Sequence, residues 1–252
     1  MDAEPRRIPL LFHVALGLGG LLLTLAALVL LALVPSLLIR ALLAPLNPAM
    51  VFCGPGGQKR LALSIDDGPS GSGSQALLAL LQELGVPATF FLIGSHLERD
   101  PAFPRLALQK GHDLGNHLWR DACAAELAEA PFWQELHDTE RLIERAAAPE
   151  SLTWRWFRPG QGWFHGAMLQ RLASRRYQLV LGSIFPWDTF RPPLWFVRWF
   201  VRLNAHPGGI LVLHDTPALS GRTLESLRWI VPELRRRGYR FVPLGELLDP
   251  DS

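Results

Sequence analysis

The sequence predicts an α/β protein with a largely parallel sheet, preceded by an apolar N-terminal segment. After residue 57, short β-rich runs alternate with runs of helical periodicity, and that alternation is typical of parallel strands joined by helices. The chain has 252 residues, enough for one α/β barrel domain of roughly 200 residues. Residues 8–39 contain no charged residue, which sets them apart from the domain that follows.

The apolar segment runs from Ile8 to Ile39 and consists mostly of Leu, Ala, Val and Gly. A helix needs roughly 20 residues to cross a bilayer, and a cleaved signal peptide has an apolar core of only about 7–15 residues. The sequence therefore predicts an uncleaved transmembrane anchor over residues 1–43, in preference to a signal peptide. Arg6 and Arg7 precede the segment, so we expect a single-pass protein with its domain outside the cytoplasm.

The later elements follow the alternation in order. A connector containing proline and glycine is expected over residues 44–57, and the α/β domain over residues 58–252. The expected strands are Arg60–Ile65, Ala88–Ile93, Thr153–Phe157, Gln178–Ser183, Ile210–Leu213 and Arg240–Val242. The expected helices are Gln75–Leu84, Pro104–Lys110, Trp133–Ala147, Ala167–Arg176 and Thr223–Arg237. The aromatic stretch Leu194–Arg202 is expected as a buried barrel helix, with a membrane-facing helix or a sugar platform as alternatives.

Composition excludes some classes of partner and site. The formal net charge is +2, with basic and acidic residues interspersed, so the concentrated basic face of a nucleic-acid-binding protein is not expected. Cys53 and Cys123 are the two cysteines, too few for a thiolate zinc site or a disulfide scaffold. They either pair, if the domain is exported, or serve as small buried hydrophobic residues.

Two motifs carry candidate metal and proton chemistry. Asp66 and Asp67 come directly after an apolar strand, at the end of a parallel strand where barrel active sites lie. Adjacent carboxylates allow one to bind a metal while the other accepts a proton from water. His117 and Asp121 are four residues apart, a spacing that places two ligands on one face of a helical turn.

Two further motifs end later strands. Arg158 begins an Arg-Pro-Gly turn, in which the guanidinium can pair with a catalytic carboxylate and the turn amides can stabilise an oxyanion. His214 ends a buried strand, where it can protonate a leaving amine or alcohol. Each motif alone has an ordinary explanation as a turn or a surface residue, but four at four strand ends indicate an active site.

The motifs resemble, in order, those of the polysaccharide deacetylase family, also called the NodB-homology domain or carbohydrate esterase family 4. The resemblance spans Arg60 to Leu248 and rests on Asp66-Asp67-Gly68-Pro69, Ala88–Gly94, Gly111–Asp121, Arg158-Pro159, Asp188 and Val212-Leu213-His214. It implies a distorted (β/α) barrel and a metal-dependent hydrolase that removes N- or O-acetyl groups from a carbohydrate. One divalent metal is implied, with zinc favoured over manganese, cobalt or nickel.

The resemblance also implies a role for each matched position. Asp66 would be the general base and His214 the general acid. Arg158 would orient Asp66, and Asp188 would tune His214. The backbone N–H of Gln161 would help to hold the oxyanion.

The implied metal ligands are Asp67, His117 and Asp121. The family usually has a second histidine where this chain has Asp121, so the resemblance implies an Asp-His-Asp site. An extra oxygen ligand shifts metal preference from zinc toward harder ions. The alternative is that Asp121 is not a ligand and that two protein ligands hold the metal.

Other departures concern the sugar site. Gly160-Gln161 replaces the usual Pro-Tyr and removes an aromatic wall. Phe185 and Thr189 stand where an acidic residue and a tryptophan are common. His96 lies outside the matched positions and is expected to be structural, whereas His112 is expected to support the second motif.

Two other functions fit the same motifs. The chain could be a catalytically inactive, membrane-tethered glycan-binding module, or it could hydrolyse a cyclic amide or another non-carbohydrate acyl group. Metal content separates the inactive module from the enzymes, and acetate release separates the two enzymes. The partners expected from the sequence are therefore a carbohydrate substrate and, through the N-terminal segment, a lipid bilayer.

Overall fold

The computed structural model describes residues 10–148 and 155–249. They form a parallel α/β barrel with the strand order β1-β6-β5-β4-β3-β2-β7, and β8 pairs with β2. The strands are β1 (Met50–Val51), β2 (Arg60–Gly68), β3 (Ala88–Leu92), β4 (Asp113–Asn116), β5 (Arg155–Phe157), β6 (Tyr177–Val180), β7 (Gly209–His214) and β8 (Arg240–Phe241). The predicted α/β class with a largely parallel sheet is thus confirmed.

Single bridges join the two ends of this sheet. Cys53, just after β1, bridges to Gly209 of β7, and Ile184, after β6, bridges to Leu211 of β7. The sheet is therefore a half-barrel in which β7 meets the segments after β1 and β6 through isolated contacts, rather than a barrel closed by a continuous ladder. Cys53 and Cys123 are both free thiols.

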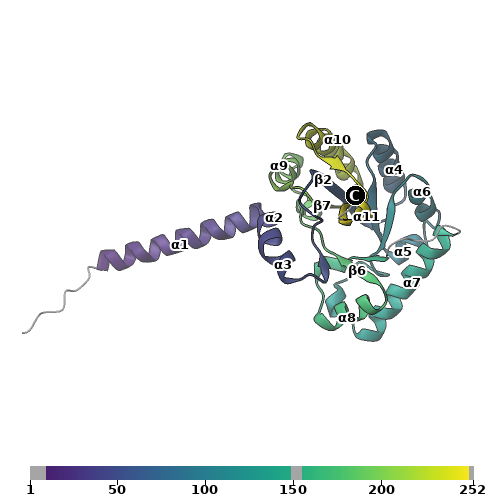
Figure 1. Cartoon of the computed structure of the whole chain (residues 1–252), viewed down its shortest axis with the longest axis horizontal. Helices are drawn as coiled ribbons and strands as arrows, with labels where there is room; N and C mark the ends of the chain where they lie inside the picture. Colours follow the sequence, from purple (N-terminus) through teal and green to yellow (C-terminus); the bar gives the residue numbers. More distant parts are fainter. Residues whose placement is uncertain (1–9, 149–154, 250–252) are drawn as a thin grey trace, which may run out of the picture.

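Helices surround the sheet (Figure 1). The main ones are α4 (Ser72–Leu84), α6 (Phe103–Gln109), α7 (Glu129–Ala147), α8 (Gly166–Ser174), α9 (Leu194–Asn204) and α10 (Ser220–Arg236). Short helical segments are α2 (Pro35–Leu38), η1 (Ile39–Leu43), α3 (Ala44–Leu46), α5 (Gly94–Leu97), η2 (Ala124–Glu126), η3 (Gly160–Gly162), η4 (Asp188–Phe190) and α11 (Leu244–Leu248). All six helices expected after residue 57, the aromatic stretch Leu194–Arg202 included, are confirmed as helices, with ends that differ by a few residues.

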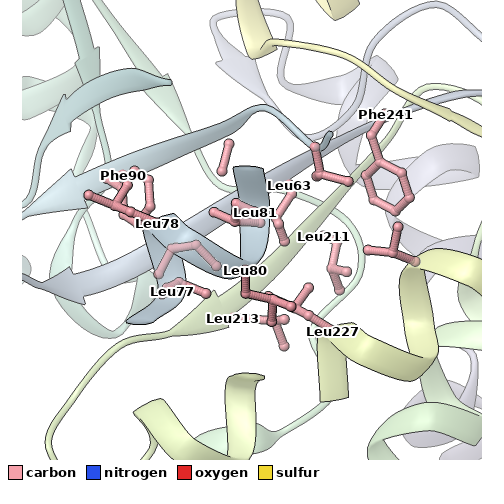
Figure 2. Packing of buried hydrophobic residues seen from close by; sticks show 14 of the residues in the cluster. Leu63, Leu77, Leu78, Leu80, Leu81, Phe90, Leu211, Leu213, Leu227 and Phe241 are labelled. Atoms are coloured by element: carbon pink, nitrogen blue, oxygen red, sulfur yellow. The ribbon is translucent and has the colours of Figure 1, made fainter. Parts of the chain in front are cut away.

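The core lies between the central strands and the helices that cover them. β2 is buried along its whole length, because it has β3 on one side and β7 on the other. Figure 2 shows leucines of α4 packed against Leu63 of β2 and against Leu211 and Leu213 of β7. Burying a leucine side chain contributes roughly 1.5–3 kcal/mol, so this cluster fixes the strands whose ends carry the site.

Two strands were not expected from the sequence. β1 lies within the stretch predicted as a connector, and it pairs with β6 through Met50 and Leu179. β4 has the sequence Asp-Leu-Gly-Asn, which has no apolar run to mark it, and its pairing with β3 and β5 places it in the sheet. The strand expected at Thr153–Phe157 is observed from Arg155, and its first two residues lie outside the described ranges.

The N-terminal segment forms α1 (Leu10–Leu33), which extends away from the barrel (Figure 1). The chain breaks at Val34, and Pro35 begins α2. Among the described residues, no single helix is long and apolar enough to span a bilayer. Only the pair Gly20–Leu33 and Pro35–Leu46, bent by 88°, meets that length and composition. The expected single transmembrane helix is not confirmed.

His112 supports the sheet, as expected from the sequence. Its Nδ1 accepts a hydrogen bond from the Ala88 backbone N–H at 3.2 Å, and its ring packs edge-on against Phe90. Burial, with a smaller effect of Lys110, lowers the pKa of His112 to about 4. The imidazole is therefore neutral at neutral pH, as an acceptor must be.

This lowered pKa predicts a pH-dependent loss of stability. The unfolded chain, with a histidine pKa near 6.5, binds the proton first, so the contribution of His112 is complete above pH 6.5 and falls toward pH 4. A shift of this size corresponds to roughly 3 kcal/mol. We expect His112→Asn, which keeps an acceptor at the δ1 position, to lose less unfolding free energy than the wild type between these pH values in urea titrations. Equal losses in both proteins would contradict this role.

Candidate active site

The site begins at the carboxyl ends of β2 and β7. These strands are parallel neighbours, and their register pairs Asp66 with His214. The Asp215 backbone N–H also donates to the Asp66 carbonyl oxygen at 2.8 Å. The predicted general base and general acid therefore lie side by side at the end of the barrel where such sites are found.

Arg158 holds Asp66 in place. The turn after β5 directs Arg158 into the barrel, where its Nη1 donates to Asp66 Oδ1 at 2.6 Å and to Ser64 Oγ at 2.8 Å. Its Nε donates to the Val180 carbonyl oxygen at 3.0 Å, and its guanidinium lies 4.1 Å from the centre of the Phe91 ring. Both charged groups are buried, so the pair orients the carboxylate within a rigid frame.

Asp67 is turned toward His117 by an unusual backbone conformation. Its φ is 69°, and the ladder between β2 and β3 is irregular at this point. Such a conformation is uncommon for a non-glycine residue, and Asp is among those that adopt it more readily. Here it places Asp67 Oδ1 3.4 Å from His117 Nε2. The strain is thus located at the predicted metal site, as is typical of functional positions.

The orientation of His117 is set from its other ring nitrogen. His117 Nδ1 lies 2.7 Å from the Arg158 carbonyl oxygen, and a carbonyl can only accept, so Nδ1 carries the proton. Nε2 is then the atom that faces Asp67. Metal-binding histidines are commonly held in this way.

The two groups shift each other's pKa. Burial raises the pKa of Asp67, but the hydrogen bond and charge of His117, with the charges of His214 and His96, bring it below the usual value. Burial lowers the pKa of His117, but Asp67, followed by the charge of Asp66, raises it above the usual value. These opposite shifts show that the two side chains interact strongly.

Asp67 and His117 fit a divalent metal ion. A carboxylate oxygen and an imidazole nitrogen are suitable donors, and two ligands about 2.1 Å from a tetrahedral ion lie about 3.4 Å apart. The distance of 3.4 Å between their donor atoms matches that spacing. Because His117 is also fixed from behind, the pair is preorganised for a metal.

Asp121 is not brought to this pair. The segment after β4 is a loop, not the helical turn expected from the spacing, and Leu118 has a φ of 64°. Arg120 anchors the loop to Glu135 of α7 through a hydrogen bond of 2.9 Å, and Asp121 is exposed. Over residues 10–148 and 155–249, no three His, Cys, Asp or Glu side chains converge as a metal centre. The helical-turn argument was therefore wrong, and ligation by Asp121 stays a prediction.

Asp188 holds His214 from two directions. Asp188 Oδ1 accepts from His214 Nδ1 at 2.9 Å, and Oδ2 accepts from the His214 backbone N–H at 2.9 Å. Burial lowers the pKa of His214, but the hydrogen bond and charge of Asp188, with the charges of Asp66 and Asp67, raise it to about 9. Near neutral pH the imidazolium therefore has a proton on Nε2 to donate.

Asp188→Asn is expected to move the alkaline limb of the pH–activity profile. A general acid works in its protonated form, so activity falls as the pH rises through its pKa. Asparagine removes the largest influence that raises the His214 pKa. We expect the alkaline limb of kcat/KM to shift to lower pH by about one unit or more. Asp138→Asn, at a partly exposed position on α7, should leave it unmoved. If the alkaline limb does not shift in Asp188→Asn, Asp188 does not set the pKa of the general acid.

Gln161 lies in η3, the turn that follows β5, and has a left-handed φ of 58°. The turn packs closely against the loop that carries Asp121. A Cβ built on Gly160 would lie 2.0 Å from the Ala122 carbonyl oxygen. Glycine is therefore required at this departure from the family's usual proline, and the oxyanion role of Gln161 stays a prediction.

Sequence reasoning missed residues that hold the site together. His96, expected to be merely structural, has its Nδ1 2.8 Å from the Asp67 carbonyl oxygen and so supports the unusual backbone there. Asp215 is fully buried and accepts from Ser70 Oγ at 2.7 Å and Ser220 Oγ at 2.8 Å, and also from Ser74 Oγ. This network ties the turn after β2 to the segment after β7. The position of Asp215 directly after His214 could have marked it as a site residue, whereas nothing in the sequence marks the three serines.

The fold and the site define a class: a parallel α/β fold with an arginine-bound carboxylate, a carboxylate-bound imidazole and an adjacent carboxylate–imidazole pair at its strand ends. The family model for polysaccharide deacetylases matches residues 54–180. The chain belongs to the polysaccharide deacetylase family.

Three similar proteins support this assignment. A peptidoglycan-N-acetylglucosamine deacetylase of Bacillus cereus (strain ATCC 14579) is 32% identical over 196 residues, covering 77% of this chain and 90% of that protein. The crystal structure of a peptidoglycan N-acetylglucosamine deacetylase in complex with an N-hydroxybenzamide superposes with a TM-score of 0.74 at 27% identity, covering 79% of this chain and 92% of the other. A CE4 family pseudoenzyme from Bacillus anthracis superposes with a TM-score of 0.72 at 26% identity, covering 80% and 69% of the two chains.

Proposed function

We propose that this chain is a metal-dependent hydrolase that removes acetyl groups from N-acetylglucosamine units of a polysaccharide. The observation that carries the proposal is the pairing of Asp66 with His214 at adjacent strand ends, each held by its own charged partner. The names of the relatives support N-acetylglucosamine as the sugar. The metal pair of Asp67 and His117 lies beside this base and acid.

Asp66 and His214 would share the proton transfers. Asp66 accepts a proton from the water whose oxygen attacks the acetyl carbon, and Arg158 keeps the carboxylate aimed at that water. His214 donates its Nε2 proton to the leaving nitrogen as the carbon–nitrogen bond breaks. The products are acetate and a free sugar amine; an ester would release a hydroxyl by the same transfers.

Asp67 and His117 would hold the metal, with Asp121 proposed as a third ligand from its loop. When bound, a divalent ion polarises the acetyl carbonyl and lowers the pKa of nearby water. Zinc is favoured, and manganese, cobalt and nickel are the alternatives. The backbone N–H of Gln161 is proposed to donate to the oxyanion.

The N-terminal segment is proposed to attach the enzyme to a bilayer, with the barrel outside the cytoplasm. The support is its lack of charge from Ile8 to Ile39 and the large exposed leucines of the described part of α1. Such exposure is costly in water and favourable in lipid.

Substrate chemistry tests the proposal. The full chain, supplied with zinc, should release acetate and free amine in equal amounts from chitooligosaccharides. Acetate without amine from an O-acetylated glycan would replace the N-deacetylase with an esterase. Acetate from neither substrate would overturn the proposal.

An inactive glycan-binding module is the second candidate. The specific observation in its favour is that Asp121 forms no three-residue metal cluster with Asp67 and His117 in the described part of the chain, while a structural relative is a pseudoenzyme. Binding of chitooligosaccharide without acetate release would assign the chain to this class.

A further inference from the structure

One face of α9 is strongly apolar and open. Val197, Phe200 and Val201 face the core and are buried. On the other side, Trp195 is 66% exposed, Trp199 40% and Leu203 44%. These three residues recur at a spacing of four, so they share one face of the helix. This exposure differs from the buried barrel helix expected from the sequence, and it leaves an apolar helix face without a partner among the described residues.

Two ion pairs flank that face. Arg198 pairs with Glu225 at 3.3 Å, and Arg202 pairs with Glu233 at 3.3 Å, both partners coming from α10. These ion pairs hold α9 against α10, and the tryptophans remain exposed to solvent. Phe196 links the aromatic rings, with its centre 6.0 Å from that of Trp195 and 5.8 Å from that of Trp199.

The carboxyl end of α9 is joined to the N-terminal segment. Asn204, which is buried, accepts from Ser36 Oγ at 2.9 Å and donates to the Leu33 carbonyl oxygen at 2.8 Å. Leu33 is the last residue of α1, whose final carbonyls lack partners within the helix. The break between α1 and α2 is therefore fixed against α9.

Further exposed leucines lie in the segments next to this joint. They lie in α2, η1 and α3 and are Leu37, Leu42, Leu43 and Leu46. Figure 1 shows α9, α2 and α3 on the side of the barrel from which α1 departs. We name this combined surface, Trp195, Trp199, Leu203 and these leucines, the basal face.

We propose that the basal face rests in the interface of a lipid bilayer, so that α9 is a second membrane contact beside the N-terminal segment. Tryptophan prefers the level of lipid headgroups, and a helix with one open apolar face and a charged flank lies in the plane of that interface. The basal face adjoins the uncharged N-terminal segment, which favours lipid over a sugar or a second copy of the chain as the partner of this face. A sugar platform would need free polar groups beside its rings, whereas the neighbouring Arg198 and Arg202 are paired with glutamates of α10.

Two contacts orient the barrel on the membrane. A single flexible tether would let the domain tumble, but the bonds from Asn204 to Ser36 and Leu33 couple α9 to the base of α1. The inference rests on the bilayer attachment proposed above and is independent of the acetyl chemistry.

Site-directed fluorescence with the full chain tests the basal face. In a Cys53→Ser, Cys123→Ser background, single cysteines replace Trp195 or Leu203 and carry an NBD label. Leu28→Cys on α1 is the insertion control. Leu106→Cys is the matched control, because it is a similarly exposed apolar residue on α6, on the other side of the barrel (Figure 1). The proteins are reconstituted in phosphatidylcholine–phosphatidylglycerol vesicles with or without doxyl-labelled lipid.

We expect the doxyl lipid to quench the labels at positions 195 and 203 at least twofold more than the label at 106. Quenching equal to that at 106, with position 28 quenched, would overturn the second contact alone. No quenching at 28 would overturn the bilayer attachment as well. If the fluorescence of the label at position 195 changes with protein concentration, the face binds a second copy of the chain. If it changes when chitooligosaccharide is added, the face binds sugar. Either result would overturn the lipid contact. Acetate release by the same proteins reports separately on the activity.

Discussion

Asp66→Asn is expected to reduce kcat by roughly 10²–10⁴-fold, the range that a general base contributes. Asparagine keeps an oxygen that can accept from Arg158 Nη1, which now lies 2.6 Å from Asp66 Oδ1, but it cannot take a proton from water. The change therefore removes the proposed proton transfer and keeps the hydrogen bond that positions the side chain. Steady-state acetate release gives kcat, and KM should change little because the substrate-binding surface is intact.

A loss of fold must be distinguished from a loss of chemistry in this variant. The buried Arg158 loses its counter-charge, and breaking a buried pair costs roughly 3–5 kcal/mol when one partner is deleted. The amide should keep part of that interaction, so thermal unfolding should remain cooperative. Asp138→Asn, which changes a partly exposed aspartate on α7, is the matched control and should keep wild-type activity. A kcat within tenfold of the wild type in a folded Asp66→Asn would remove Asp66 from the role of base.

His117→Ala is expected to abolish metal retention at micromolar concentrations and to remove acetate release with it. Its Nε2 lies 3.4 Å from Asp67 Oδ1, and these two atoms are the only predicted ligands that the described structure brings together. Losing His117 leaves only carboxylate ligands, Asp67 with or without the proposed Asp121, and removes the imidazole nitrogen that favours zinc. Equilibrium dialysis against zinc, read by elemental analysis, measures the affinity directly.

Two companion variants sharpen that measurement. His137→Ala removes an exposed histidine on α7 and should bind metal like the wild type. Asp121→Ala tests the proposed third ligand, and we expect a weaker effect than for His117→Ala because Asp121 lies in an exposed loop. Wild-type affinity in Asp121→Ala would leave a two-ligand site. Full affinity in His117→Ala would overturn the metal site as assigned.

The sequence predicted the site where strands position it. β2 and β7 are long apolar runs that end in Asp66 and His214, so their ends could be located and expected at one edge of a parallel sheet. The family resemblance added partners that no local pattern predicts. The pairing of Asp188 with His214 across 26 residues is an example.

Other parts of the site depend on contacts that no local pattern encodes. β4 is only four residues long and has a polar sequence, so pairing with its neighbours decides its structure. The loop after it was mistaken for a helical turn because the spacing of His117 and Asp121 fits one, whereas Glu135 of α7 and the left-handed Leu118 determine its path. The contact of His96 with the Asp67 backbone arises only once β2 and α5 pack together.

In the N-terminal segment, too, local sequence predicted some features, while others depend on distant contacts. Its lack of charge was evident, but the break at Val34 and the fixed joint with Asn204 were not, because the joint links positions 168 residues apart. The exposed tryptophans of α9 also differ from the buried helix with two exposed arginines that was favoured for Leu194–Arg202. An aromatic run of this kind fits both a core helix and an interfacial one, and only the packing against α10 distinguishes them.

The central claim is metal-dependent N-deacetylation, and a metal titration of acetate release tests it most directly. The full chain is stripped with a chelator and assayed on a chitooligosaccharide while zinc is added back. The account predicts no acetate from the stripped protein, recovery that saturates at about one ion per chain, and one free amine for each acetate. A folded, zinc-loaded chain that releases no acetate, or a stripped chain that releases it at the same rate, would contradict the account.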